Sequence, residues 1–572
     1  EGRFRDAVAT LEKALERNPR LLPSNLILGL DLVRLGEPGQ ALKPIEAVLA
    51  QEPSNHDALF GLAGAYFALN RMDDAAHAYL RDVAVRPKDT AAWYGMGVCF
   101  ERLAENSARQ MSQEDAQSPY YQRLVGEFLL RQGAELDAEQ AFRQALAGAH
   151  KSGALELHAA LGFVQLRLGR FSQAQNEFNV ELREHPGSLE AQLGLAALEL
   201  NQGQAAKASK QLCAVRHADP GFWMTHLGFL ADSLDSKVAA DLTRAEPSDA
   251  SSCGGVLKSL QSELASPGAQ TGDEQAFETS PSSSKSTSAA VSASVARDRA
   301  AAASGHYTKC ATALAAASLT SAPDRLLFAR CACRAGRFLA AREAAREALR
   351  QGPHNAEALY WSSEASKKLA QAAFLRAMRL DPNSWQGRVL AGDIYRQRKQ
   401  WDLARSNYLA AARLKPSSPA PYLGIATVDW QNGEFEKAQS ALQETLARDP
   451  QNLQASFESG DILVRQRHFR EAIPYLEKTV AGEPELLAAH ADLGKCYAAL
   501  GGANRAIEEL NRALPMDRAG DLHYLLYVEY KRQGHMKLAR TALTESQKLR
   551  AVNLEMQQHR LNEALESAQS KR

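Results

Sequence analysis

The stretch Trp385–Pro416, WQGRVLAGDIYRQRKQWDLARSNYLAAARLKP, decides how this chain folds. Its apolar residues recur three or four positions apart, the spacing of one face of an α-helix. Small residues stand at Gly392 and Ala404, one in each half, and Pro416 closes the second half. The stretch therefore predicts two amphipathic helices that cross at small side chains and end at a proline.

The same pattern returns at a fixed spacing. Pro450 and Pro484 each lie 34 residues after the previous closing proline. Proline cannot continue a helix, so each one sets an exit turn. The full set is Pro19, Pro53, Pro87, Pro186, Pro220, Pro353, Pro382, Pro416, Pro450 and Pro484. A period of ~34 residues holds two helices and two turns, which is the tetratricopeptide period.

The chain resembles the tetratricopeptide repeat family at the positions that carry the motif. In one unit these are Trp385, Gly392, Tyr395, Ala404, Tyr408, Ala411 and Pro416. The crossing position of the second helix is Ala41, Ala75, Ala138, Ala174, Ala208, Ala341, Ala404, Ala438, Ala472 or Ala506. The first helix answers with Gly29, Gly97, Gly126, Gly162, Gly392, Gly460 or Gly494. Glycine costs ~1 kcal/mol inside a helix, so its recurrence indicates close packing.

The resemblance implies an all-α fold, a right-handed superhelical solenoid in two arrays. We predict an N-terminal array at 1–240 with a truncated first repeat, and a C-terminal array at 298–549. Residues 241–297 are rich in Ser, Ala and Gly, so we interpret them as a flexible linker, with a short helix over 257–264. Residues 550–572 are expected to form a polar capping helix or tail.

Two units are shorter than the period, at 90–118 and 356–384. Each is expected to lose part of a helix, which makes the superhelix locally irregular. The segment 105–118 lacks the apolar pattern of a second helix. At the start of the chain, Gly2-Arg3-Phe4 matches the turn and second helix of a repeat. We therefore expect the natural N-terminus to lie upstream, which leaves a preceding signal peptide or catalytic domain open.

Composition and motifs exclude several functions. Lys plus Arg and Asp plus Glu both number 67, whereas a nucleic-acid partner would call for a basic excess. No apolar run approaches the ~18 residues of a membrane span. The sequence has no nucleotide-binding loop, no His-Glu-x-x-His and no Gly-x-Ser-x-Gly. We expect no enzymatic activity, no cofactor, no metal ion and no small-molecule substrate, and the compartment stays open.

The seven cysteines allow three interpretations. Cys99, Cys331 and Cys496 share one place in their first helices, and Cys310 takes the place of a packing Ala, so we favour buried, unlinked thiols. A Cys310–Cys331 disulfide is an alternative, and it would imply an oxidising compartment. Metal binding by Cys310, Cys331 and Cys333 with His306 is the weakest of the three, because the spacing is not that of a zinc site.

In the family, the first helices line a concave groove. In the N-terminal array its places hold Ile27, Leu30, Gly61, Gly64, Tyr94, Val98, Ala160, Phe163, Leu193 and Ala197. In the C-terminal array they hold Asp393, Arg396, Thr427, Trp430, Glu458, Asp461, Asp492 and Lys495. We predict that this second set, with Tyr94 and Phe163, binds peptides. The Lys and Asn set of the carboxylate clamp and the Asn ladder of O-GlcNAc transferase are both absent.

These features predict a non-enzymatic scaffold or adaptor that binds other proteins or peptides in its grooves. The acidic C-terminal groove, with Trp430 as a platform, favours a segment with Lys or Arg beside an apolar residue. The charges could instead serve only to keep the groove soluble. An accessory module of a larger enzyme, or of an envelope or secretion assembly, is an alternative function, and a purely structural assembly subunit is another.

Overall fold

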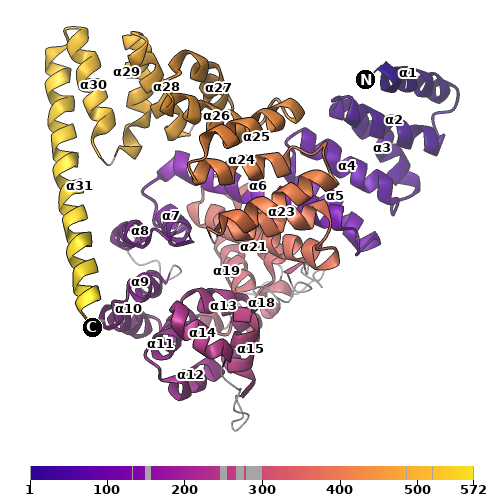
Figure 1. The fold of residues 1–572 in the computed structure, drawn as a ribbon. Helices are drawn as coiled ribbons and strands as arrows, with labels where there is room; N and C mark the ends of the chain where they lie inside the picture. Colours follow the sequence, from indigo (N-terminus) through magenta and orange to yellow (C-terminus); the bar gives the residue numbers. More distant parts are fainter. Residues whose placement is uncertain are drawn as a thin grey trace. The chain divides into compact units, whose positions relative to one another are not determined.

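In the computed structural model, the described residues form helices and no strand (Figure 1). The described ranges are 2–131, 133–148, 156–244, 254–265, 276–277, 299–317, 319–397, 399–484, 486–517 and 519–570. The chain divides into two compact units, Glu1–Asp381 and Pro382–Arg572. Among the described helices, none is both long and apolar enough to cross a membrane.

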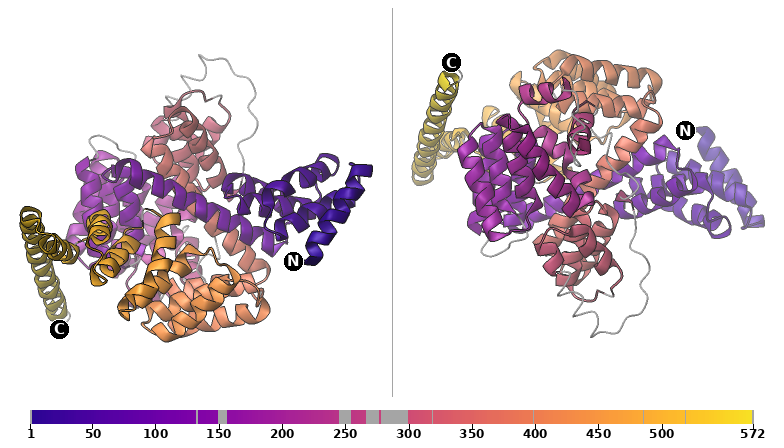
Figure 2. Two further views of the ribbon diagram at one scale, coloured as in Figure 1. Left: turned by 90° about the horizontal axis from the view of Figure 1, so that it is seen from above. Right: turned by 90° about the horizontal axis from the view of Figure 1, so that it is seen from below.

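The first unit is built of helices, most of which pack against the next helix along the chain (Figure 2). They are α1 (Gly2–Arg17), α2 (Leu22–Arg34), α3 (Pro38–Gln51), α4 (His56–Ala68), α5 (Met72–Val85), α6 (Thr90–Asp115), α7 (Pro119–Arg131), α8 (Glu135–Gly148), α9 (Leu157–Arg167), α10 (Phe171–Glu184), α11 (Leu189–Asn201), α12 (Ala205–Ala218), α13 (Pro220–Asp232), α14 (Ser236–Arg244), α15 (Gly254–Ala265), α18 (Tyr307–Ala315), α19 (Ala322–Arg334), α20 (Phe338–Gln351) and α21 (Ala356–Leu380).

The second unit continues the pattern with more regular repeats. Its helices are α22 (Trp385–Gln397), α23 (Trp401–Leu414), α24 (Ala420–Gln431), α25 (Phe435–Arg448), α26 (Leu453–Arg465), α27 (Phe469–Gly482), α28 (Leu487–Ala499), α29 (Ala503–Ala513), the short 3₁₀ helix η1 (Leu514–Met516), α30 (Asp521–Arg532) and α31 (Met536–Ser570). The helix pair predicted over 385–416 is thus present as α22 and α23.

Small residues hold the helix pairs together, as the pattern predicts. Every alanine at the predicted crossing position has no exposed surface: Ala41, Ala75, Ala138, Ala174, Ala208, Ala341, Ala404, Ala438, Ala472 and Ala506. The glycines opposite make room for a large side chain. A Cβ on Gly162 would lie 2.5 Å from Phe178, and one on Gly392 would lie 2.6 Å from Tyr408. The repeat motif therefore encodes knob-and-socket contacts between each pair of helices.

The two short units each form one long, unbroken helix. In regular repeats a residue with positive φ stands 14 places after the start of the first helix, as Gly36 does after Leu22. The corresponding residues of α6 and α21 are Ala104 and Ala370, and alanine favours continuing the helix. The helices run to 26 and 25 residues, so 105–115 continues the first helix instead of forming a separate one.

Helices α6 and α21 pack against each other over much of their length. The Ser363 hydroxyl donates to the Ala104 carbonyl at 3.1 Å, and the rings of Tyr94 and Phe374 lie 5.7 Å apart. We call the helices up to α15 the first series of repeats, and those from α18 onward the second series. A Cβ on Gly97 of α6 would meet Phe374 of α21 at 2.4 Å, so this glycine makes room for a side chain of the second series and not for a helix of its own repeat. The second series therefore joins the first within one unit, through α18 to α21.

The boundary between compact units lies at Asp381 and Pro382, and not in the Ser-rich stretch where we placed the linker. Most of 241–297 lies outside the described residues, and the linker prediction falls there. Within it, α15 contains the predicted short helix, and its Val256 and Leu260 are buried. This helix packs on α12 and α13, so this part of the stretch is folded.

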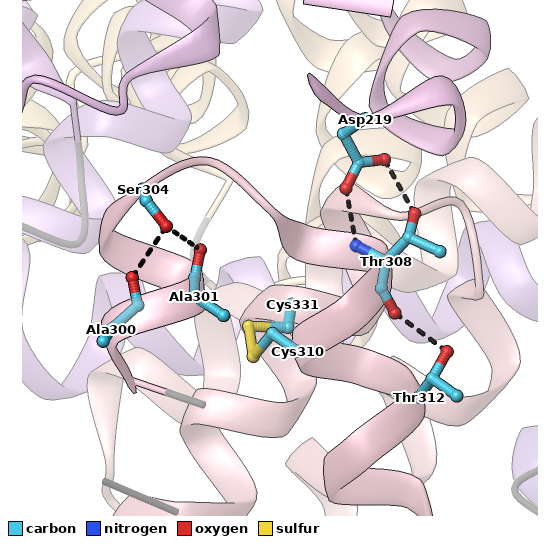
Figure 3. The surroundings of a disulfide bond; sticks show 8 residues. All are labelled: Asp219, Ala300, Ala301, Ser304, Thr308, Cys310, Thr312 and Cys331. Carbon is cyan, nitrogen blue, oxygen red and sulfur yellow. Dashed lines mark hydrogen bonds between the residues drawn. A yellow bond between two sulfur atoms is a disulfide. The ribbon is translucent and has the colours of Figure 1, made fainter. Parts of the chain in front are cut away.

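A disulfide joins the helices α18 and α19 of the second series (Figure 3). Cys310 and Cys331 are bonded, with Cα atoms 5.9 Å apart. The favoured interpretation of these two as unlinked thiols is therefore wrong, and so is the metal site that needed them. Beside the disulfide, Asp219 accepts hydrogen bonds from the Thr308 amide and hydroxyl, at 2.6 and 2.7 Å. This contact fastens α18 to the end of the first series.

Candidate functional site

The candidate site is a row of polar side chains along the first helices of the second unit. Helices α22, α24, α26, α28 and α30 pack in sequence, each against the next. The predicted residues lie on these helices: Asp393, Arg396, Thr427, Trp430, Glu458, Asp461, Asp492 and Lys495. The structure adds Glu529 and Arg532 of α30, which hold the equivalent places one repeat later.

Two hydrogen bonds connect neighbouring helices of the row. The Thr427 hydroxyl donates to Glu458 Oε1 at 2.8 Å, and the Trp430 indole N–H donates to Asp461 Oδ2 at 2.7 Å. Both bonds run from α24 to α26. Because Thr427, Glu458 and Asp461 are buried, these bonds fix the relative position of the two helices. Trp430 is thus held as a rigid ring and is only half-buried.

Each carboxylate of the row other than Glu458 is paired with a cation on its own helix. Arg465 contacts Asp461 at 2.6 Å, Lys495 contacts Asp492 at 2.8 Å, and Arg532 contacts Glu529 at 2.6 Å. The pair Arg396 and Asp393 is looser, at 3.5 Å. A second bond, from the Tyr408 hydroxyl at 2.7 Å, holds Asp393.

The cations, and not the carboxylates, reach solvent in three of these pairs. The exposed fractions of the side chains are 55% for Arg465 against 9% for Asp461. They are 42% for Lys495 against 7% for Asp492. On α30 they are 44% for Arg532 against 4% for Glu529. On α22 the order is reversed, since Asp393 is more exposed than Arg396. Most of the acidic side chains of the row are therefore buried, and the charged ends of their arginine and lysine partners face the solvent.

Burial also weakens the negative charge of the row. It raises the pKa of Glu458 to about 7, against the hydrogen bonds from Gln454 and Thr427 that lower it. It raises the pKa of Asp393 and of Asp492 in the same way, although Tyr408 and Lys495 act in the opposite direction. Desolvation disfavours the charged form, whereas guanidinium groups stay charged. The face is therefore less acidic at neutral pH than its formal charge suggests.

Two carboxylate oxygens of the row make no hydrogen bond in the described part of the chain, Glu529 Oε2, which contacts Arg532, and Glu458 Oε2. Glu458 accepts from Thr427 and from Gln454 Nε2 at 3.0 Å, both through Oε1. Its Oε2 is buried and makes no hydrogen bond. A buried polar atom of this kind costs free energy until a partner satisfies it.

In the first unit, several of the predicted groove residues are buried against other parts of the chain, whereas Ile27 is 49% exposed. Phe163 has no exposed surface and packs edge-on against Phe178 and Phe229, with ring centroids 5.2 and 4.5 Å apart. Tyr94 lies against Phe374 of α21. Leu193 and Ala197 are also fully buried. Tyr94 and Phe163 thus belong to the first unit and the row belongs to the second, and both rings contact other aromatic side chains of the first unit.

Sequence reasoning missed a buried ionic cluster in the first unit. Arg334 of α19 contacts Glu156 and lies 3.4 Å from Glu190 of α11. Arg123 of α7 reaches the same Glu190 at 3.3 Å, and these cations hold the pKa of Glu190 well below its usual range. The partners lie far apart in the sequence, on repeats of different series, so no local motif could have indicated them.

Comparisons with known proteins agree with this architecture. Family models described as tetratricopeptide repeat match residues 26–92, 160–221, 326–366, 368–419 and 423–467, and a second such model matches 463–526. A curated relative is the anaphase-promoting complex subunit cut9 of Schizosaccharomyces pombe, 28% identical over 185 residues, or 31% of this chain. The match spans only 28% of the length of that relative.

Solved structures that match part of this chain include MamA from Desulfovibrio magneticus RS-1 and YrrB. MamA is 22% identical with a TM-score of 0.26, and the match covers 28% of this chain and 96% of MamA. YrrB, described as a tetratricopeptide protein with an unusual peptide-binding site, is 19% identical with a TM-score of 0.29, over 31% of this chain and 92% of YrrB. By its family matches and its stacked helix pairs, the chain belongs to the tetratricopeptide repeat family.

Proposed function

We propose that this chain is a non-enzymatic interaction scaffold that binds peptide segments along the first helices of its second unit. Tetratricopeptide repeats support a scaffold role in general terms. The observation that carries the finer proposal is the ordered row from Asp393 to Arg532, with Trp430 fixed by Asp461 as a half-buried platform. Rigid, amphipathic rings of this kind are the usual anchors of a binding surface.

The exposed groups favour an acidic segment over a basic one. Arg465, Lys495 and Arg532 present their charged ends to solvent, while their carboxylate partners are buried. A peptide carrying Asp or Glu beside an apolar residue would meet these cations directly and place the apolar side chain on Trp430. This preference is the reverse of the one inferred from the acidic residues of the sequence, because formal charge ignores burial. Charge sets specificity and on-rate more than affinity.

The test compares two peptides of equal length around one Leu, one with Glu and one with Lys at the flanking positions. Both are titrated into the full chain by fluorescence anisotropy at low and at high salt. We expect the acidic peptide to bind more tightly, and the difference to shrink with salt, because exposed charges are screened over ~8–10 Å. Trp430→Ala should weaken binding about tenfold by removing the platform.

The matched variants are Arg465→Gln and Arg512→Gln. Each arginine is about half exposed and pairs with a carboxylate four residues earlier, but Arg512 lies on the second helix α29. Arg465→Gln should weaken binding of the acidic peptide, and Arg512→Gln should not. Equal binding of the two peptides, or an equal effect of the two variants, would overturn the proposed site. An accessory module of a larger enzyme or envelope assembly could use the same surface, and the upstream coding sequence separates these roles.

A further inference from the structure

We propose that the first unit holds a site for a divalent cation of the zinc class, with His56, Asp57 and Asp89 as its ligands. His56 begins α4, and Asp89 caps α6. His56 Nε2 lies 3.3 Å from Asp89 Oδ2 and 4.0 Å from Asp57 Oδ1. Imidazole nitrogen and carboxylate oxygen are ligands that zinc takes. This site is independent of the peptide-binding face, which belongs to the other unit.

Asp82 of α5 fixes the orientation of the imidazole. Its Oδ1 lies 2.6 Å from His56 Nδ1, and the carboxylate is fully buried. When Nδ1 carries the proton toward Asp82, Nε2 offers its lone pair on the other side of the ring. Metal-binding histidines are usually held in this way by a carboxylate on the second nitrogen. His56 Nε2 makes no hydrogen bond within the described residues, so this lone pair is available.

Asp89 is positioned by its role as a helix cap. Its Oδ1 accepts the amides of Ala91 and Ala92, at 2.8 and 3.1 Å. Its Oδ2 is thereby left facing His56. Zinc–nitrogen and zinc–oxygen bonds of about 2.0–2.2 Å in a tetrahedron separate neighbouring ligand atoms by about 3.3 Å. The observed 3.3 Å between Nε2 and Oδ2 matches that edge.

A third ligand and the charge balance complete the site. Asp57 Oδ1 lies 4.0 Å from His56 Nε2, and its side chain is 67% exposed, so rotation about its own bonds can turn the carboxylate toward that nitrogen. Asp82 Oδ2 is buried and has no hydrogen-bond partner in the described residues. Three carboxylates converge on one imidazole, with Arg86 as the nearby cation that acts on Asp82. With the imidazole neutral, the three carboxylates outnumber the one arginine, and a divalent cation would compensate the excess negative charge.

Two other histidines that pair with carboxylates, His490 and His158, do not offer this geometry. His490 uses both ring nitrogens, one toward Glu509 and the other toward the Pro484 carbonyl at 2.8 Å. His158 contacts Glu177 at 2.8 Å through Nδ1. Neither has a second carboxylate recorded near its other nitrogen. His158 therefore provides a matched control, because it shares the contact of His56 with a carboxylate but lacks the additional ligands.

The experiment titrates Zn²⁺ into the full chain, freed of metal by a chelator, and follows the heat of binding. We expect one tight site that is lost in His56→Gln and unchanged in His158→Gln. Asp82→Asn should weaken zinc binding about 10- to 100-fold, because it removes the group that orients the ligand. Co²⁺ gives a second readout, since its visible absorption is intense in a tetrahedral site and should disappear in His56→Gln.

Two further variants keep the proposal falsifiable if His56→Gln fails to fold. Asp57→Asn alters an exposed side chain, and Asp89→Asn keeps a capping amide oxygen. Both should fold, by circular dichroism, and both should bind Zn²⁺ more weakly than the parent chain. If the parent chain takes up no Zn²⁺, the cluster is an imidazolium ion pair only and the proposal is wrong. The same holds if Asp57→Asn and Asp89→Asn bind Zn²⁺ as tightly as the parent chain.

Discussion

Glu458 shows how burial of a single residue changes the charge of the polar row on the first helices. The side chain is 2% exposed, has one oxygen without a hydrogen-bond partner, and has no cation among its hydrogen-bond partners. Burial raises its pKa to about 7. The other carboxylates of the row each contact an arginine or lysine. Glu458 is therefore the group of the row whose charge changes near neutral pH.

This pKa predicts how stability depends on pH. In the unfolded chain a Glu titrates near ~4.3, so between that value and about 7 the folded state binds more protons. Its contribution to stability is therefore complete below the unfolded pKa and is lost as the pH rises through the folded pKa. Glu458→Gln, which stays neutral, should be more stable than the parent by roughly 1–3 kcal/mol at pH 8 and little different at pH 5.

Urea unfolding of the full chain at pH 5 and pH 8 measures this difference. Glu508→Gln is the control, because Glu508 is 61% exposed on the outer helix α29. It should show no such pH-dependent gain. Parallel stability curves for Glu458→Gln and the parent would mean that the folded and unfolded carboxyl groups titrate alike.

The glycine of the helix crossing gives a second prediction at this scale. A Cβ on Gly392 would lie 2.6 Å from the ring of Tyr408, which has no exposed surface. Tyr408 is also held by its bond to Asp393 and cannot move aside easily. Gly392→Leu should therefore cost about 1–3 kcal/mol through overpacking. Gly64→Leu is the control, since no atom lies within 4 Å of a Cβ built there. Thermal melts showing equal stability for both variants would contradict the packing role.

Among the elements, the pair α18 and α19 depends on a covalent link. Helix α18 has only nine residues. Isolated helices this short are marginal in water. The disulfide closes a loop with a sequence separation of 21 and fastens α18 to the longer α19. The bond to Asp219 then anchors the pair to the first series.

Replacing both Cys310 and Cys331 by Ala should lower the stability of the first unit by about 2–4 kcal/mol, the usual effect of losing a disulfide. The second unit should melt as before, because contacts in a repeat array are local. Substitution is a cleaner test than a reductant, since Cys213 is disulfide-bonded as well. Differential scanning calorimetry follows the two units. Unchanged melting of the first unit, or a loss shared equally by both, would contradict the link's local role.

The regular elements could be predicted from the sequence because their signals are local. The crossing alanines, the glycines opposite them and the closing prolines recur within each repeat, and the structure confirms the helices they predict. We did not predict from the sequence that each short unit forms one long helix, α6 in one and α21 in the other. Ala104 and Ala370, which stand where regular repeats have their turn residue, could have indicated it. The packing of α6 on α21 could not be predicted, because it joins residues more than 200 positions apart, such as Ser107 and Ser362.

The candidate site also has some features that the sequence predicts and others that it does not. The places of Trp430, Glu458 and Asp461 on the inner face follow from the repeat, and the structure puts these residues on adjoining helices. The repeat pattern does not predict which of these side chains are exposed to solvent, because exposure depends on how far each side chain extends. Arg465 and Lys495 extend past the shorter carboxylates that they neutralise. The His56 cluster likewise draws on three successive helices at irregular spacing, so no motif indicated it.

At the scale of the whole molecule, the repeat series and the compact units do not coincide. The second series begins with α18, yet α18 to α21 belong to the first unit, and the boundary falls after Asp381. The reason is the interlocking of α6 with α21, together with the ionic contacts of Arg334 in α19. The second unit has apolar clusters of its own, one of them built around Tyr408 and Leu442.

Two fragments test this boundary. Residues 382–572 keep every helix from α22 onward, so the fragment should be soluble, monomeric and cooperatively folded. Residues 299–572 add α18 to α21 but lack α6, which leaves Phe374 without Tyr94 and Ser363 without its partner Ala104. An apolar face that loses its partner in this way promotes association. The longer fragment should therefore aggregate, or bind a hydrophobic dye that the shorter one does not.

Size-exclusion chromatography with light scattering separates the outcomes. Adding residues 1–277 as a separate chain should rescue the longer fragment, because that chain supplies α6 and the carboxylates of Glu156 and Glu190 that pair with Arg334. It should have no effect on 382–572. A soluble, monomeric 299–572 that ignores the added chain would show that the second series folds without the first. The boundary between independently folding units would then coincide with the boundary between the two repeat series. The packing of α6 on α21 would be only a surface contact between two independent arrays.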